Sequence, residues 1–238
     1  MKELSPELVK ELRLKANQIR RDICITTSKL PYAHLGGGMS MTDMVTALYY
    51  DVLNFDPKDP RNPDRDRFVL SKGHTAPGLY SALAHRGYFP VEDLKTLRHT
   101  GSYLQGHPDM KHIPGVDMSS GSLGQGISAA VGMALAAKLS NEDYRVYTLL
   151  GDGEIQEGQV WEASMLAGSR KLDNLVVIVD NNNLQIDGTI EEVNSPYPID
   201  KKFEAFNFHV ITINGNDMDE IAAALKEARE TKGMPTAI

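Results

Sequence analysis

The chain has almost no cysteine. Cys24 is the single cysteine among 238 residues, so an intramolecular disulfide cannot form and a reducing compartment is indicated. We expect Cys24 to pack inside an amphipathic helix. Apolar runs of roughly eighteen residues, as a membrane span requires, are also missing. The polar, acidic start of the chain does not look like a signal peptide. These absences predict a cytoplasmic protein.

Clusters of basic residues are missing as well. The 25 Lys and Arg residues are outnumbered by 32 Asp and Glu, and the net charge is -7. This composition argues against a nucleic acid or an anionic membrane as a partner. If a chain this acidic binds an anionic cofactor, a cation is needed to bridge the two negative charges. With 41% hydrophobic and 24% charged residues, the chain is an ordinary globular protein that is long enough for a large core.

Two polar clusters each follow an apolar run. Gly151-Asp152-Gly153 comes after Tyr147–Leu150, and Asp180–Asn183 comes after Leu175–Val179. Short apolar runs bounded by turn residues indicate buried parallel strands. Because ligands bind at the carboxyl ends of parallel strands, we expect Asp152 and the asparagines to meet at that edge of the sheet.

These side chains would form a site made of oxygen ligands. A carboxylate and an amide suit Mg²⁺, which keeps water and takes further oxygens from a bound phosphate. The two glycines beside Asp152 allow a tight turn and a close approach of backbone N–H groups to an anion. A lone Asp between glycines is more often a simple turn, but the second cluster at the next strand end favours a binding site. The residues alone leave open which of Asn181, Asn182 and Asn183 binds the cation.

Helical and strand patterns alternate along the rest of the chain. Ser5 followed by Pro6 marks the start of a first helix, and Ser40 the start of a second. The glycine-rich segment 33–38, the segments 56–66 and 99–120, and a turn at 186–188 are expected to be irregular. Helices are expected at 5–28, 40–50, 76–85, 91–98, 127–139, 157–168 and 217–231, and strands at 67–70, 147–150, 175–179, 208–213 and from 235 onward.

This alternation predicts the fold class. We expect one doubly wound α/β domain over residues 1–238, with a mostly parallel sheet and helices on both faces. The carboxyl edge of that sheet would carry Asp152, the asparagines and His74, since His74 follows the strand at 67–70.

The motifs resemble those of a known family. The Gly151–Gly153 motif, followed after roughly thirty residues by an Asn-rich strand end, is similar to the diphosphate-binding motif of thiamine diphosphate (ThDP) enzymes. Four further segments resemble transketolases: Ala33–Gly36, Phe68–His74, Gly106–Pro108 and Gly121–Ile127. The resemblance runs from about Lys15 to the last residue. By it the chain is identified as the amino-terminal, diphosphate-binding subunit of a split transketolase.

The resemblance implies ThDP and Mg²⁺ as cofactors, with Ca²⁺ or Mn²⁺ as substitutes for Mg²⁺. It assigns the cation to Asp152, the side chain of Asn182 and the backbone carbonyl of Leu184. Asn182 is selected because Ile186-Asp187-Gly188 also matches the family pattern and so sets the register.

Further cofactor contacts are implied in the same way. Gly153 would donate its N–H to the diphosphate, and Gly121 and Leu123 would contact the aminopyrimidine ring through the backbone. Glu157 and Glu162, which we count with the cofactor-binding residues, fall where the family has carboxylates that communicate between active sites across a subunit interface. Alternatively, both are solvated helix charges.

Three histidines match transketolase segments. His34 and His74 would lie near the diphosphate and the reacting carbon, so His74 also counts as cofactor-binding, and His107 would hydrogen-bond a hydroxyl of the donor sugar. Histidine suits such catalytic tasks because its pKa lies near neutrality. The remaining histidines have no match and are expected to be structural: His85, His99, His112 and His209.

The resemblance also implies a partner. In transketolases the pyrimidine-binding domain carries the glutamate that protonates the aminopyrimidine and most residues that bind the sugar phosphate. No such domain occurs in the 238 residues. We therefore expect it on a separate carboxy-terminal subunit, in an α₂β₂ assembly. The chain alone would be inactive and would expose an apolar face.

The implied activity is transfer of a two-carbon ketol unit from a ketose phosphate to an aldose phosphate, as in the pentose phosphate pathway. Three alternatives stay open. The first is a condensation like that of deoxyxylulose phosphate synthase, against which Ser71–His74 and Gly106–Pro108 argue. The second is ketol transfer from a sulfo-sugar or branched ketose. The third is a non-catalytic ThDP-binding relative.

Asp152→Ala should abolish Mg²⁺-dependent ThDP binding, because the diphosphate would then face an acidic chain without a compensating cation. Titration calorimetry with and without Mg²⁺ measures the affinity. Asp59→Ala, in the predicted irregular segment 56–66, is the control. Unchanged affinity in Asp152→Ala would show that the cation is assigned to the wrong residue.

Overall fold

The computed structural model describes residues 5–30, 33–186 and 188–238. The first four residues, from which we inferred that no signal peptide is present, and Asp187 of the predicted turn lie outside this part. The chain forms two compact units. The first comprises Met1–Arg65, Gly73–Ser119 and Ile213–Leu225, and the second comprises Asp66–Lys72, Ser120–Thr212 and Lys226–Ile238. That residues 1–238 act as one diphosphate-binding domain stays a prediction.

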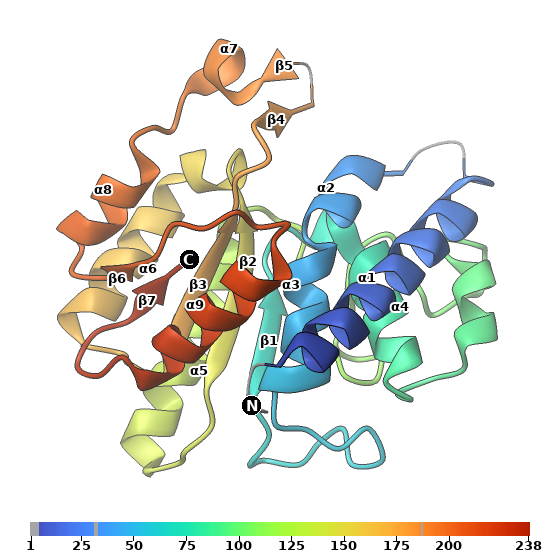
Figure 1. Cartoon of the computed structure of the whole chain (residues 1–238), viewed down its shortest axis with the longest axis horizontal. Helices are drawn as coiled ribbons and strands as arrows, with labels where there is room; N and C mark the ends of the chain where they lie inside the picture. Colours follow the sequence, from blue (N-terminus) through green and yellow to red (C-terminus); the bar gives the residue numbers. More distant parts are fainter. Residues whose placement is uncertain (1–4, 31–32, 187) are drawn as a thin grey trace. The chain divides into compact units, whose positions relative to one another are not determined.

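The second unit is built on a parallel five-stranded sheet (Figure 1). The strand order is β1-β2-β3-β7-β6, and each neighbouring pair is parallel. β2 and β3 are buried along most of their length, which is the burial expected for strands covered on both faces. The predicted α/β class with a mostly parallel sheet is confirmed. The strands are β1 (Arg67–Leu70), β2 (Val146–Gly151), β3 (Leu175–Asp180), β6 (His209–Val210) and β7 (Thr236–Ala237).

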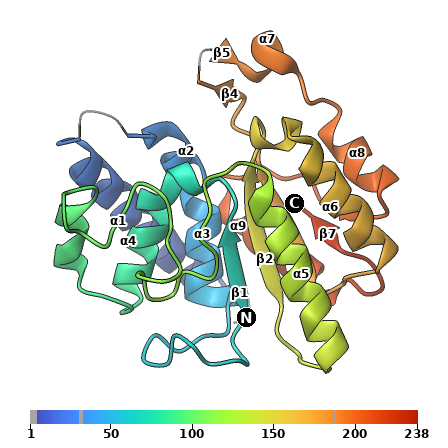
Figure 2. The ribbon, with the colours of Figure 1, turned by 180° about the vertical axis from the view of Figure 1, so that it is seen from behind.

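Helices α5 and α6 cover one face of this sheet (Figure 2). α5 packs closely on the chain directly after β1, since a Cβ at Gly126 would lie 2.5 Å from Ser71 Oγ. The sequence patterns did not predict the two short helices α7 and α8. α9 belongs partly to each unit. The helices are α5 (Gln125–Ser140), the short 3₁₀ helix η4 (Glu154–Gln156), α6 (Gly158–Ser169), α7 (Ile190–Asn194), α8 (Ile199–Ala205) and α9 (Met218–Glu230).

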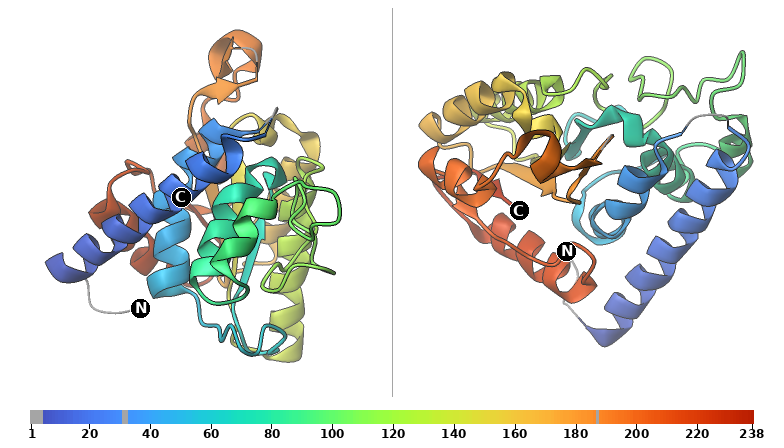
Figure 3. Two further views of the ribbon diagram at one scale, coloured as in Figure 1. Left: turned by 90° about the vertical axis from the view of Figure 1, so that its right-hand side faces the viewer. Right: turned by 90° about the horizontal axis from the view of Figure 1, so that it is seen from above.

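A small arm, residues 184–194, follows β3. In it β4 (Leu184–Gln185) and β5 (Gly188–Thr189) pair as antiparallel strands, and α7 follows directly. Thr189 begins α7 with a capping box, in which its side chain accepts from Glu192 N and Glu192 reaches back to the Thr189 backbone. Figure 3 shows the arm standing beyond the end of the sheet.

The first unit is helical. Ser5 is the N-cap of α1, as predicted, and its side chain accepts a hydrogen bond from Leu8 N at 3.2 Å. α1 is tied to α4 through Asp22, whose carboxylate accepts from Ser81 Oγ at 3.0 Å and contacts His85 Nε2 at 2.6 Å. The elements are α1 (Pro6–Thr27), α2 (Leu35–Ser40), α3 (Thr42–Ala47), the π-helix η1 (Leu48–Val52), the 3₁₀ helix η2 (Gly73–Thr75), α4 (Ala76–His85) and the 3₁₀ helix η3 (Val91–Thr96).

The prediction of an irregular segment at 33–38 is wrong from Leu35 onward. Gly36, Gly37 and Gly38 are helical in α2, so Ser40 ends this helix and does not cap the next one. A Cβ at Gly38 would lie 3.8 Å from the side chain of Ile23, an ordinary contact distance, and a Cβ at Gly36 would meet nothing within 4 Å, so packing does not require glycine at these two positions. The three glycines lie within the helix and do not break it.

Other expectations need correction too. The α-helix predicted at 91–98 is the shorter 3₁₀ helix η3, because Leu97 turns to ψ 123° and Arg98 adopts φ 59°. The strand predicted at 208–213 is reduced to β6. Cys24 lies in α1 but is exposed, because the buried face of the helix passes through Ile23 and leaves the next residue outside.

Gly168→Ala should lower the free energy of unfolding by about 1–3 kcal/mol, because the new Cβ would lie 1.8 Å from the backbone oxygen of Phe206. Gly132→Ala is the control in another helix of the same unit. Its Cβ meets nothing within 4 Å, so this change should stabilise the protein by about 0.5–1 kcal/mol. Urea denaturation measures both, and equal effects would contradict the close contact.

Candidate functional site at the carboxyl ends of the strands

The parallel register places the carboxyl ends of β2 and β3 side by side. Gly151 lies opposite Asp180 in the register, and Asp152 N donates to Asp180 O at 3.3 Å. The polar clusters after the two strands are therefore adjacent, as the sequence pattern led us to expect.

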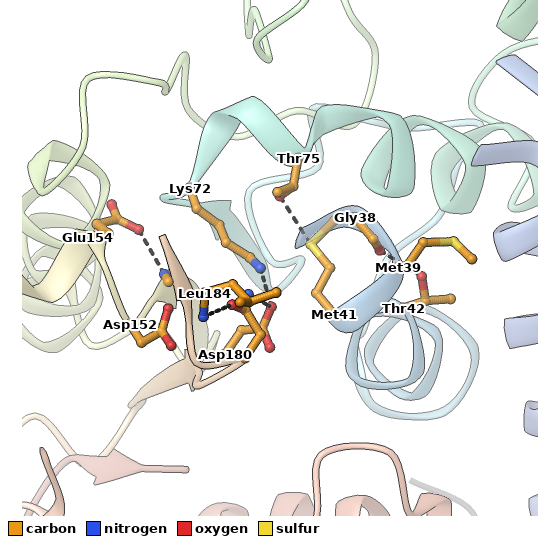
Figure 4. A network of polar contacts seen from close by, with 12 residues as sticks. Gly38, Met39, Met41, Thr42, Lys72, Thr75, Asp152, Glu154, Asp180 and Leu184 are labelled. Atoms are coloured by element: carbon orange, nitrogen blue, oxygen red, sulfur yellow. Dashed lines mark hydrogen bonds and ion pairs between the residues drawn. The ribbon is translucent and has the colours of Figure 1, made fainter. Parts of the chain in front are cut away.

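The Asp152 carboxylate, labelled in Figure 4, is buried, with 2% of the residue exposed, and backbone donors hold both of its oxygens. Oδ1 accepts from Gly153 N at 2.9 Å, and Oδ2 accepts from Asn183 N at 2.7 Å. Burial raises the pKa of Asp152, while these two hydrogen bonds oppose the rise. The negative charge of Asp180 also raises this pKa, and Lys72 lowers it. The protein thus holds an anion here that a cation would stabilise.

The asparagines form a tight turn after β3. Asn182 Oδ1 accepts from Leu184 N at 3.0 Å, and Asn182 Nδ2 lies 3.4 Å from Asp180 Oδ2. Asn183 has φ 62°, in the left-handed region, which asparagine tolerates better than most residues. This conformation accompanies the contact between its N–H and Asp152.

The oxygen atoms at these strand ends fit a Mg²⁺ ion. Each Asp152 oxygen accepts one backbone hydrogen bond and keeps a lone pair, as does Asn182 Oδ1. The Leu184 carbonyl, which the resemblance assigns as the third ligand, is an oxygen of the hard type that Mg²⁺ prefers. Within the described residues, no three His, Cys, Asp or Glu side chains form a group that could hold a metal ion.

Lys72 is a buried charge that the sequence patterns did not single out. Its ammonium forms an ion pair with Asp180 (Figure 4), and 2% of the Lys72 side chain and 12% of the Asp180 side chain are exposed. The sequence places Lys72 two residues after the apolar strand 67–70 and Asp180 directly after the run 175–179, but no local pattern pairs the two residues.

Glu154 is the second missed residue, and 3% of it is exposed. Oε1 accepts from Ser71 Oγ at 2.5 Å and from Gly124 N at 3.0 Å, and Oε2 accepts from Gly151 N at 3.1 Å. Burial raises the pKa of Glu154, and these hydrogen bonds oppose the rise. One carboxylate therefore joins the ends of β1 and β2 to the loop before α5.

The other predicted cofactor contacts also lie in the second unit. Gly153 N donates to Asp152. Gly121, with φ 128°, and Leu123, 37% exposed, precede α5 in the loop that Glu154 holds through Gly124. Glu157 is the N-cap of α6, and Glu162 lies within that helix; both are exposed.

The three predicted histidines all lie in the first unit. His34 is the N-cap residue of α2 and His74 lies in η2, and their rings contact edge to face with centroids 4.8 Å apart. His107 lies in the irregular segment 99–120. Partial burial lowers the pKa of His107, and the charges of His34 and Arg98 lower it further. His107 is thus favoured in its neutral form.

Tyr80 of α4 positions the loop that carries His107. Its hydroxyl lies 2.9 Å from the backbone oxygens of both Gln105 and His107. Tyr80 is buried, and burial raises the pKa of its phenol well above the ordinary value, so the donor stays protonated. The sequence patterns gave no sign of this contact.

The other histidines pair with acids in three cases. His85 contacts Asp22, His112 contacts Asp109, and His209 contacts Glu227.

Among the described residues, no helix is both long and apolar enough to cross a bilayer.

Residues 13–238 match the family model described as transketolase, thiamine diphosphate binding domain. Two similar proteins are named as parts of transketolases. The 6-deoxy-6-sulfo-D-fructose transketolase subunit SqwG of Clostridium sp. (strain MSTE9) is 47% identical over 96% of this chain and 83% of its own length. An apulose-4-phosphate transketolase subunit of Actinobacillus succinogenes is 44% identical over 94% of this chain and 82% of its own length.

A solved structure agrees with these matches. Transketolase from Leishmania mexicana superposes with a TM-score of 0.90 at 38% sequence identity. The match covers 95% of this chain and 36% of the Leishmania chain. The fold class is thereby supported by a structure of substantial sequence identity.

Lys72→Met should lower the free energy of unfolding by about 3 kcal/mol, because it removes the cationic partner of the Asp180 carboxylate, which is 12% exposed. Lys138→Met is the control, since Lys138 pairs with Asp173 while 42% of its side chain is exposed, and should cost less than about 1 kcal/mol. Chemical denaturation compares the two variants. Similar losses would mean that burial of the Lys72–Asp180 pair is energetically unimportant.

Proposed function

Since the chain belongs to the transketolase family and matches its ThDP-binding domain, we propose that it is the cofactor-binding subunit of a two-chain transketolase. The reaction would transfer a two-carbon ketol unit from a ketose to an aldose phosphate. The observation that carries the proposal is that two relatives matched over 83% and 82% of their length are both named as transketolase subunits. The strand-end cluster of carboxylate, amide and carbonyl oxygens supports a role in binding a diphosphate through a cation.

At the strand ends, Asp152, Asn182 and Leu184 would hold Mg²⁺, with Ca²⁺ or Mn²⁺ as substitutes. The ion would bridge the diphosphate to an edge that is otherwise acidic, which the buried Asp152 carboxylate supports. Gly121 and Leu123 would contact the aminopyrimidine through the backbone of a loop held by Glu154. When bound, ThDP supplies the electron sink for breaking the carbon–carbon bond.

The histidines would act on protons around the reacting groups. His34 and His74 touch each other, so they form one imidazole pair. His107 would hydrogen-bond a hydroxyl of the donor sugar. Its lowered pKa supports this role, because a neutral imidazole can accept a hydrogen bond from a hydroxyl at neutral pH.

The partner would be a carboxy-terminal subunit that carries the pyrimidine-binding domain, in an α₂β₂ assembly. Exposed apolar residues on α6 support a docking surface near the carboxylates that we place at the interface. Met165 is 58% exposed and Leu166 is 42% exposed, and they follow Glu162 by three and four positions, which is the spacing of one helix face. Permanent interfaces of this kind bury about 2,000 Å² or more.

The donor sugar has two candidates. A ketose phosphate is the ordinary donor for the family that the sequence resembles. The names of the two similar subunits favour a second candidate, a sulfo-sugar or a branched ketose, because those proteins are named for 6-deoxy-6-sulfo-D-fructose and apulose-4-phosphate.

Isolation of the tagged chain with its native partner tests the proposal. The complex is assayed for two-carbon transfer from xylulose 5-phosphate, 6-deoxy-6-sulfo-D-fructose and apulose 4-phosphate, with ThDP and Mg²⁺ added or withheld. We expect a stoichiometric second chain and transfer that needs both cofactors. Consumption of pyruvate instead would favour the synthase-like reaction. Cofactor binding without turnover on any substrate would favour a non-catalytic relative.

In the same complex, His107→Ala should lower turnover by about a hundredfold while leaving ThDP affinity near that of the wild type, because His107 is proposed to contact the donor and not the cofactor. His112→Ala is the control from the same loop, since that exposed side chain pairs with Asp109. Steady-state kinetics and ThDP titration separate the two effects. Parallel losses of turnover and cofactor affinity would mean that His107 is assigned the wrong role.

A further inference from the structure

Tyr197 contacts the turn that carries two of the proposed cation ligands. Its hydroxyl lies 2.9 Å from Oδ1 of Asn181 and 2.5 Å from Oδ1 of Asn183. These asparagines flank Asn182. We propose that Tyr197 is a positioning residue: its hydroxyl holds the 181–184 turn in the conformation in which Asn183 N donates to Asp152. The expected effect on cofactor binding rests on the proposed function.

The backbone and side chain of Asn183 are used together. Its N–H donates to Asp152 Oδ2 at 2.7 Å, its carbonyl accepts from Ile190 N at 3.0 Å, and its amide contacts Tyr197. The residue has φ 62°, which is unfavourable for most side chains unless local contacts stabilise it. The Tyr197 hydroxyl is therefore one of a small set of contacts that keep this backbone in place.

One hydroxyl can serve both asparagines. A phenol has one hydrogen to donate and lone pairs to accept with. It can donate to one amide oxygen and accept from the NH₂ group of the other amide after a half-turn of that amide. Tyr197 can thus join the two residues on either side of Asn182 at the same time.

The backbone that presents Tyr197 is itself fixed. Gln156 Nε2 donates to Asn194 O at 2.6 Å at the end of α7, and the Lys202 ammonium contacts the backbone oxygen of Pro196. Gln156 Nε2 also donates to Gln185 Oε1 at 2.8 Å. The Gln156 side chain therefore connects η4 to both ends of the arm. Tyr197 is 36% exposed, so its ring is partly covered while its hydroxyl reaches the turn.

The consequence is a chain of contacts that ends at a proposed ligand. Loss of the Tyr197 hydroxyl frees the amides of Asn181 and Asn183, and the Asn183 N–H then leaves Asp152 more often. The cation site becomes less ordered before binding, so affinity falls. No proposed reacting group touches Tyr197, so the rate of the chemical step should stay the same.

Hydrogen–deuterium exchange of the full chain, without cofactor or partner, tests the positioning role directly. In Tyr197→Phe, the backbone amide hydrogens of residues 181–185 should exchange about three- to tenfold faster than in the wild type, as expected for removal of one ordinary hydrogen bond. Tyr144→Phe is the matched control. Tyr144 precedes β2, and its hydroxyl donates to Met133 O at 3.0 Å. Removal of this hydroxyl should leave the exchange rates of the backbone amides 181–185 unchanged. Unchanged exchange in Tyr197→Phe overturns the proposal.

The cofactor effect is measured in the two-chain complex. Tyr197→Phe should raise the apparent KM for ThDP at fixed Mg²⁺ about three- to tenfold and leave kcat at saturating cofactor within about twofold. A lower kcat with an unchanged KM contradicts a role in positioning the cation site. If the wild-type complex binds no ThDP, the proposed function fails, while the exchange experiment still decides whether Tyr197 orders the turn.

A second variant separates the route through Asn183 from a general loss of stability. Asn183→Gly keeps the backbone N–H and adopts positive φ readily, but it lacks the amide that Tyr197 contacts. We therefore compare the effect of Tyr197→Phe in two backgrounds. In Asn183→Gly it should raise the exchange rate of the backbone amides 181–185 by less than half of the factor by which it raises that rate in the wild type. An undiminished effect in that background overturns the route through Asn183.

Discussion

Burial of the Asp152 carboxylate is the constraint on which the rest of the strand-end site depends. A buried carboxylate is costly unless hydrogen bonds or a cation compensate it. Both of its oxygens accept backbone N–H groups, from Gly153 on its own strand end and from Asn183 on the next. The second donor requires that β2 and β3 end level and that Asn183 adopt a left-handed backbone. Strand register and turn conformation therefore both serve one charge.

Further buried charges join the neighbouring strand ends. Glu154 accepts hydrogen bonds from three segments, and Lys72 pairs with Asp180. Burial raises the pKa of both Asp152 and Glu154, and the Lys72 charge opposes the rise in both. Fully satisfied polar networks of this kind specify one arrangement of the backbone. The proposed cation and diphosphate site would thus be largely formed before the cofactor arrives.

The sequence predicted the parts of this fold that depend on local pattern. Apolar runs located β1, β2 and β3, and the Ser5-Pro6 pair located the start of α1. The glycines at 36–38 misled, because glycine weakens a helix without preventing one, and these three residues are helical in α2. The contacts of Lys72 with Asp180, of Glu154 with Ser71 and of Tyr197 with Asn183 span 108, 83 and 14 residues, so the fold is needed to reveal them. The roles of the histidines came from family resemblance and stay proposals.

The most direct test of the central claim is a crystal structure of the two-chain complex with ThDP and Mn²⁺ in place of Mg²⁺, with anomalous diffraction used to locate the ion. Our account predicts one strong anomalous peak within coordination distance of a carboxylate oxygen of Asp152, of Asn182 Oδ1 and of the Leu184 carbonyl, with diphosphate oxygens completing the coordination. A diphosphate and ion bound by other residues, with the 181–184 turn making no contact to either, would contradict it.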